Sequence, residues 1–207
     1  MQSDFSNIQA IIFDLGGVII DLDVSATQKA FSEISGRPPE EILQMTTQPY
    51  FEKYEVGAID DPTFRAHIRE DLRFEGPEVL IDEAWNAMLG PITIQRLEKL
   101  EALAKRYRLF VMSNTNSIHV RRFLKIADHV SPQKSFHDYF ENVYFSHEVE
   151  VRKPNVEAWQ PIFNENDLSP RQALFIDDRK DNIAAAQALG MQVLHNPEIN
   201  HWLSVVN

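Results

Sequence analysis

The chain has 207 residues, of which 43% are hydrophobic and 25% charged, as is ordinary for a folded core domain with or without a smaller insertion. Its formal net charge of −11 disfavours nucleic acids and anionic membranes as partners, because a strongly acidic surface repels them. The sequence contains no cysteine, which excludes disulfides and leaves only oxygen or imidazole ligands for a metal ion.

Four short apolar segments have the pattern of buried β-strands, and each ends abruptly at a polar residue. In chain order they are residues 9–13 before Asp14, 108–112 before Ser113, 173–176 before Asp177 and 191–194 before His195. Helical patterns at residues 96–105, 155–163 and 183–189 alternate with them, and residues 169–172 have the sequence of a capping box. This alternation predicts an α/β fold with a Rossmann-like, doubly wound parallel sheet.

Residues 23–91 lack the strand pattern and show helical periodicity instead. The predicted helices cover residues 24–34, 40–45, 50–56, 62–72 and 79–89. We therefore expect a small helical cap domain at residues 23–91, inserted into a core domain that consists of residues 1–22 and 92–207.

The polar residues at the strand ends are the first candidates for a functional site. Ligands of open α/β sheets bind beyond the carboxyl ends of the strands, at the switch in strand order. We therefore expect Asp14, Ser113 and Asp177 to share one crevice, although they lie far apart in the sequence.

The acidic residues among them indicate a metal site. Asp177 and Asp178 would repel each other at the end of a buried strand, and a hard divalent cation such as Mg²⁺ relieves that repulsion. The alternative to a metal ion is that water solvates both carboxylates in an open loop. Asp14 precedes two glycines that allow a tight turn close to a ligand, with the capping of a turn as its alternative.

Ser113, Asn114 and Lys153 are candidates for phosphate binding. The hydroxyl of Ser113 and the backbone N–H of Asn114 can hold phosphate oxygens, although such a pair is by itself usually a turn or a helix cap. Lys153 precedes a proline on a rigid turn, where its ammonium could neutralise a phosphorylated nucleophile. The alternative is that Lys153 is an ordinary exposed lysine.

In combination and in this order, these segments resemble the haloacid dehalogenase superfamily, which consists mostly of phosphatases. The matching motifs are Phe13-Asp14-Leu15-Gly16-Gly17-Val18, Ser113, Lys153 and Asp177-Asp178. The resemblance extends from residue 11 to about residue 193, and the helical segment 23–91 matches the family's cap after the first motif.

The resemblance implies a role for each motif residue. Asp14 is implied to be the nucleophile, which forms an aspartyl-phosphate with Lys153 beside it. The implied phosphate-binding residues are Ser113, Asn114 and Lys153. The implied ligands of Mg²⁺ are Asp14, the carbonyl of Gly16, Asp178 and, directly or just behind it, Asp177.

Within the superfamily, residues 14–21, 112–119 and 152–154 resemble the bacterial α-D-glucose-1-phosphate phosphatases, and residues 54–59 support the same subgroup. This resemblance implies a sugar phosphate such as glucose 1-phosphate as the substrate. The aromatic residues Tyr50, Phe51, Tyr54 and Trp85 are candidates for the substrate-facing cap surface, with core packing as the more common role of such residues.

Gly16 departs from the family pattern. Most phosphatases of the superfamily carry there a second aspartate, which acts as general acid and then as general base, help that is typically worth about 10²–10⁴-fold in rate. The candidates to replace it are His119, Glu52, Glu55, His67, Asp21 and Asp23. His119 is by itself more often a surface residue.

Two other functions remain open at this point. The hydrolytic dehalogenases of the superfamily also lack the second aspartate and use no metal, but their fourth motif is not an acidic pair. The second alternative is a catalytically silent binding module with the same fold. The apolar segments are too short for a membrane span or a signal peptide, so we expect a cytoplasmic protein. We further expect a monomer or weak homodimer that acts on a small phosphorylated molecule, without nucleic acid or membrane partners.

Overall fold

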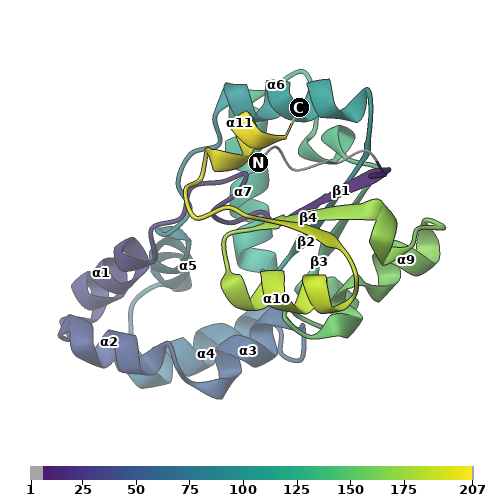
Figure 1. Ribbon diagram of the computed structural model, residues 1–207. Helices are drawn as coiled ribbons and strands as arrows, with labels where there is room; N and C mark the ends of the chain where they lie inside the picture. The colour runs from purple at the N-terminus through teal and green to yellow at the C-terminus, as the bar shows by residue number, and fades with distance from the viewer. Residues whose placement is uncertain (1–6, 207) are drawn as a thin grey trace.

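The computed structural model describes residues 7–206, which contain one five-stranded, fully parallel sheet with the strand order β3-β2-β1-β4-β5 (Figure 1). The strands are β1 (Ala10–Phe13), β2 (Arg108–Ser113), β3 (Asn142–Phe145), β4 (Ala173–Asp177) and β5 (Gln192–His195). The order reverses at β1, whose neighbours are β2 and β4. The predicted Rossmann-like α/β class is therefore confirmed.

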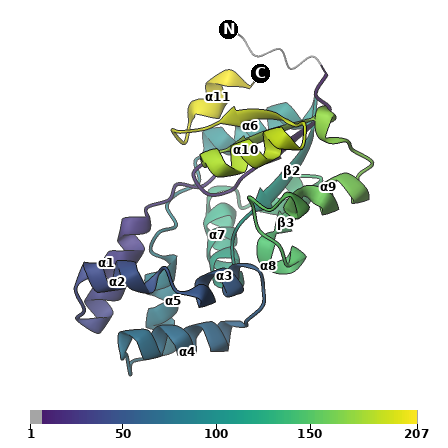
Figure 2. The ribbon, with the colours of Figure 1, turned by 60° about the horizontal axis from the view of Figure 1, so that its bottom comes forward.

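Five helices follow β1 and lie together to one side of the sheet (Figures 1 and 2). We call them the cap helices: α1 (Val24–Ser35), α2 (Pro39–Met45), α3 (Pro49–Glu55), α4 (Asp61–Leu72) and α5 (Glu78–Asn86). They pack around a hydrophobic cluster of their own that includes Phe31, Phe64 and Trp85. The boundaries predicted for a cap domain, at residues 23 and 91, stay predictions.

The remaining helices flank the sheet. They are α6 (Ile94–Ala104), α7 (Ser117–Val130), α8 (Ser146–Val149), α9 (Gln160–Glu165), α10 (Lys180–Ala188), α11 (His201–Val205) and the 3₁₀ turns Phe136–Tyr139, Val156–Trp159 and Pro170–Gln172. The predicted capping box is present at Ser169 and Gln172. The single helix predicted for 155–163 is instead a 3₁₀ turn followed by α9, because Pro161 starts a new helix at its first turn.

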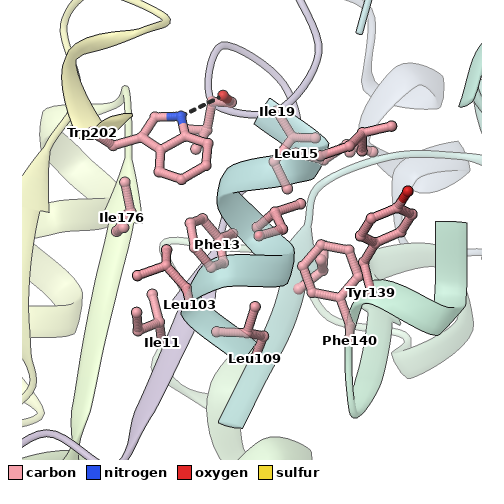
Figure 3. Close-up of a cluster of buried hydrophobic side chains, with 14 of the residues drawn as sticks. Ile11, Phe13, Leu15, Ile19, Leu103, Leu109, Tyr139, Phe140, Ile176 and Trp202 are labelled. Atoms are coloured by element: carbon pink, nitrogen blue, oxygen red, sulfur yellow. Dashed lines mark hydrogen bonds between the residues drawn. The ribbon is translucent and has the colours of Figure 1, made fainter. Parts of the chain in front are cut away.

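Alternate residues of the buried strands face two different hydrophobic clusters. Phe13 belongs to the cluster that also contains Trp202 of α11 (Figure 3), whereas Ile12 belongs to the cluster with Trp159 and Phe175. A parallel sheet covered on both faces explains why these strands read as continuous apolar runs. The indole N–H of Trp202 donates to the carbonyl of Val18 at 2.9 Å and so holds the loop after β1.

Four of the strands were predicted from the sequence, and β3 was not. It begins with an exposed asparagine and a half-buried valine, and only Tyr144 and Phe145 are buried. As the edge strand beside β2, it has no long apolar run that would distinguish it from a loop. None of the helices within residues 7–206 combines the length and the apolar character needed to cross a lipid bilayer.

Candidate active site

The carboxyl ends of three neighbouring strands bring the predicted polar residues together. Phe13 pairs with Val111 of β2 and Ile176 of β4, so the residues that follow these positions lie side by side at one edge of the sheet. The backbone N–H of Asp14 donates to the carbonyl of Ile176 at 2.8 Å. Asp14, Ser113 and Asp177 therefore lie at the same edge of the sheet, at the switch in strand order, but the fully buried Asp177 does not line the cavity there.

Lys153 reaches this edge from the loop after α8 and contacts two carboxylates. Its ammonium Nζ lies 2.8 Å from Oδ1 of Asp14 and 2.8 Å from Oδ2 of Asp177. Burial alone would lower the pKa of Lys153, but the two carboxylates outweigh it and raise this pKa. Lys153 is therefore a buried, charged ammonium beside Asp14, not an exposed lysine.

Asp177 is fully buried, and both of its oxygens accept hydrogen bonds from the protein. The donors besides Lys153 are the backbone N–H of Arg179, 2.8 Å from Oδ1, and the side-chain amide of Asn182, 3.1 and 3.0 Å from the two oxygens. Asp177 thus fixes the position of the Lys153 ammonium. The amide of Asn182, which is itself buried, thus orients the Asp177 carboxylate.

Asp14, Asp177 and Asp178 form an acidic cluster in which one oxygen of each lies within 4.8 Å of the others. Burial raises the pKa of Asp14 to about 7, Lys153 opposes this change, and the two other carboxylates add to it. Burial, and then Asp177, raise the pKa of Asp178 as well. These carboxylates lack sufficient compensating charge, so the donor set and its electrostatics fit a hard divalent cation.

The turn after β1 leaves room for this cluster. Gly17 has a φ of +70°, and a Cβ atom at this position would lie 2.6 Å from Oδ2 of Asp178. At Gly16, a Cβ atom would lie 2.5 Å from the Cδ1 methyl group of Leu22. Leu22 therefore occupies the direction in which a side chain at position 16 would extend.

Asn114 has a supporting role that its sequence position did not reveal. Its side-chain amide donates to the carbonyl of Lys153 at 2.8 Å, and its side-chain oxygen accepts from the N–H of Lys153 at 2.9 Å. This pair of hydrogen bonds joins the end of β2 to the loop that carries the lysine.

A cavity of about 390 Å³ opens over these residues, a volume within the usual range for small-molecule sites. Its lining includes Asp14, Gly16, Ser113, Asn114 and Lys153, together with Asp178 and Asn182. The lining also includes the charged residues Glu55, Arg152 and Arg179 and the apolar residues Leu22, Val24, Trp85, Met88 and Leu89. All the residues predicted for phosphate and metal binding except the buried Asp177 line this one cavity.

Four of the six candidates for the missing acid do not line the cavity. Asp21 forms an ion pair with the buried Arg96 at 2.7 Å, and Asp23 caps α1 by accepting from the N–H of Ser25. The rings of His67 and Tyr50 stack with their centroids 4.8 Å apart. Glu52 lies on α3 with its side chain 67% exposed.

His119 lines the cavity, but it is buried and not a surface residue. Its Nε2 lies 3.0 Å from the carbonyl of Trp85, and its Nδ1 lies 3.2 Å from the side-chain amide of Asn116. Burial lowers the pKa of His119 to about 4. Both ring nitrogens therefore have partners, and the ring holds α7 against α5.

The four aromatic candidates on the cap helices are buried at 9% exposure or less, in the cluster of the cap helices. Trp85 is the one of the four that also lines the cavity. Tyr50, Phe51 and Tyr54 pack against Phe64. For these three residues, core packing is the observed role.

Comparison with known proteins agrees with this geometry. A family model described as haloacid dehalogenase-like hydrolase matches residues 8–190, most of the chain. The chain belongs to the haloacid dehalogenase-like hydrolase family. The curated D-ribitol-5-phosphate phosphatase of Bacteroides thetaiotaomicron is 26% identical over 199 residues, covering 94% of this chain and 95% of the relative.

Two further proteins are similar to this chain over nearly their whole length. The crystal structure of a haloacid dehalogenase-family enzyme from Bacteroides thetaiotaomicron, in complex with magnesium and inorganic phosphate, is 31% identical with a TM-score of 0.87 and covers 97% of this chain and all of that chain. The sesquiterpene phosphatase astK of Aspergillus oryzae is 23% identical over 201 residues, 92% of this chain and 90% of the relative. This haloacid dehalogenase-like hydrolase is thus similar in sequence to two proteins named as phosphatases and in structure to an enzyme that was crystallised with magnesium and inorganic phosphate.

Proposed function

We propose that this hydrolase is a magnesium-dependent phosphatase in which Asp14 attacks the phosphorus of a small phosphomonoester. The observation that carries the proposal is the contact of Lys153 with Asp14 at 2.8 Å, directly beside the acidic cluster with Asp178. A nucleophilic carboxylate, a buried ammonium and a cation site in one cavity are what phosphoryl transfer requires, because positioning and charge neutralisation supply most of its catalysis.

In this proposal, Asp14, Asp178 and the carbonyl of Gly16 hold Mg²⁺, and Asp177 acts through Lys153. When bound, the ion neutralises the carboxylates and the oxygens of the phosphoryl group. The hydroxyl of Ser113, the backbone N–H of Asn114 and the ammonium of Lys153 orient that group for in-line attack by Asp14. The contacts of Asp177 and Asn114 with Lys153 keep the ammonium in place.

For the substrate, we propose a phosphorylated sugar or sugar alcohol, with glucose 1-phosphate as one candidate. The size of the cavity and the charged residues Glu55, Arg152 and Arg179 in its lining suit a small molecule with hydroxyl groups. The similarity to a ribitol-phosphate phosphatase supports the same class. The apolar lining residues Leu22, Val24 and Met88, with the similarity to a sesquiterpene phosphatase, make prenyl phosphates the second class to test.

The acidic cluster also separates this function from the two alternatives. A metal-independent dehalogenase has no need of three carboxylates within 4.8 Å of one another, which would repel without a cation. A silent binding module has no need of a buried lysine between two of them. A cytoplasmic location and a monomeric or weakly dimeric state stay predictions.

The test is a screen of the purified protein with and without Mg²⁺ over sugar phosphates, sugar-alcohol phosphates, nucleotides, prenyl phosphates and a 2-haloacid. We expect metal-dependent release of phosphate, and we expect Asp14→Asn to abolish it because an amide is a poor nucleophile. Asp128→Asn, an exposed position on α7, is the matched control and should keep full activity. Appreciable turnover by Asp14→Asn would show that another group is the nucleophile.

A further inference from the structure

The proposed reaction needs a proton for the leaving group, and the core of this enzyme offers no side chain at Gly16 to supply it. A side chain at position 16 would meet the Cδ1 methyl group of Leu22, an exposed residue that would have to move to make room for it. Of the six candidates for its replacement, Glu55 and His119 line the cavity. Because both ring nitrogens of His119 have partners, Glu55 is the remaining acid.

Glu55 is the last residue of α3, and three features of the structure hold this end of the helix against the core. The hydroxyl of Ser146 lies 2.5 Å from the carbonyl of Glu55 and also accepts from the N–H of Thr115 at 2.9 Å. Gly57 follows at a φ of +69°, and a Cβ atom there would lie 2.3 Å from the carbonyl of His147. Glu55 is therefore fixed at the cavity by contacts with the segments that follow β2 and β3.

Burial and the neighbouring arginines act on the Glu55 carboxylate in opposite directions. Its Oε2 is buried and lies 3.2 Å from Nε of Arg152, but within residues 7–206 neither atom has a hydrogen-bond partner. Burial raises the pKa of Glu55, Arg152 and Arg179 lower it, and Glu52 raises it. The net effect is a raised pKa, which suits a group that must give and take protons.

We propose that Glu55 is the general acid and base of this enzyme and that the cap helix α3 thus supplies what the core lacks at Gly16. The inference rests on the proposed phosphatase function. As the bond from Asp14 to phosphorus forms and the ester P–O bond breaks, the carboxylic acid of Glu55 gives its proton to the leaving oxygen, which departs as an alcohol. The Glu55 carboxylate then takes a proton from water as this water attacks phosphorus, the bond to Asp14 breaks and phosphate leaves.

The test compares Glu55→Gln with the wild type on phosphate esters that differ in leaving group, measured as kcat/KM at saturating Mg²⁺. An alkyl or phenyl leaving group needs the proton, whereas p-nitrophenolate leaves without it. We expect a loss of about 10²-fold or more for phenyl phosphate and for the best sugar phosphate, and a change of at most a few-fold for p-nitrophenyl phosphate. The alkaline decline of kcat/KM for phenyl phosphate should also disappear in Glu55→Gln, because only the protonated acid is active.

Glu52→Gln is the matched control, because Glu52 lies 3.6 Å from the same Arg152, on the same helix, but does not line the cavity. It should keep the activity and the leaving-group dependence of the wild type. An equal loss on all esters in Glu55→Gln would mean a binding or structural role, and unchanged activity would exclude any role; both overturn the proposal. Inactivity of the wild type on every ester would instead refute the phosphatase function itself.

Discussion

Lys153 is fully buried, a position that an ammonium group tolerates only with partners of opposite charge. Asp14 and Asp177 provide them at 2.8 Å. The sequence identifies the lysine by its place before a proline in the family motif, but it does not show that Asp177 contacts the lysine. That arrangement depends on Asn182 and the backbone of Arg179, which occupy the other lone pairs of Asp177.

At the residue scale, we predict that Lys153→Met lowers the metal-free stability by about 3 kcal/mol, because it leaves two buried carboxylates without their counter-ion. Adding Asp177→Asn should restore part of this loss, since it removes one of the uncompensated charges. Urea unfolding of the wild type, both single variants and the double variant measures the coupling between the two residues. Additive losses would contradict the ion pair.

The turn after β1 is the element that places the acidic cluster. The sequence indicates a turn there because of Gly16 and Gly17, but the reason for each glycine differs. Gly17 combines a positive φ with a close approach to Asp178, whereas Gly16 faces Leu22. Only the folded chain shows these neighbours, because Asp178 lies far along the sequence at the end of β4.

At the element scale, we predict that Gly17→Ala weakens Mg²⁺ binding about tenfold or more by displacing the Asp178 carboxylate. Gly36→Ala is a matched control, because Gly36 has nearly the same φ of +68° but nothing within 4 Å of a Cβ atom. Both variants introduce similar backbone strain, so only the first should change the Mg²⁺ titration. Calorimetric titration measures the affinity directly, and equal effects in both variants would move the metal away from Asp178.

At the scale of the whole molecule, the cap helices are docked on α7 by buried polar contacts. The side-chain oxygen of Asn116 caps α7 by accepting from the N–H of His119, and His119 reaches the carbonyl of Trp85 on α5. Ile118 joins the hydrophobic cluster of the cap helices. The contact between the two parts is therefore apolar and hydrogen-bonded, with a histidine that stays neutral at its centre.

We predict that this contact makes the protein sensitive to acid. The pKa of His119 falls from its ordinary value of 6.5 to about 4 in the folded chain, because burial disfavours the charged ring. The unfolded chain therefore binds the proton first, and stability is lost as the pH falls from 6.5 towards 4, by an amount on the order of 3 kcal/mol.

Unfolding free energies of the wild type and His119→Gln at pH 7 and pH 4 measure this contribution. The variant should be less stable than the wild type at pH 7 and should lose less stability on acidification. His129→Gln, at an exposed position of the same helix, should follow the wild type at both pH values. Parallel losses in the wild type and His119→Gln would contradict the assignment.

The parallel α/β core and the strand ends that contribute to its cavity could be predicted from the sequence, because buried strands leave apolar runs and their ends carry the polar residues. The sequence also identified Asp14, Ser113, Lys153 and Asp178, which all line the cavity. It missed β3, because an edge strand that begins with exposed residues has no such run.

The roles of residues that depend on distant neighbours could be assigned only from the folded chain. The tertiary structure shows that His119, a candidate acid, is a buried contact between α7 and α5, and that Glu55 of the cap helices lines the cavity. Local sequence patterns report periodicity and turns, whereas the partner of a side chain and its exposure to water depend on how separate elements pack. The proposed proton donor could therefore be chosen only from the packing of separate elements and not from local sequence patterns.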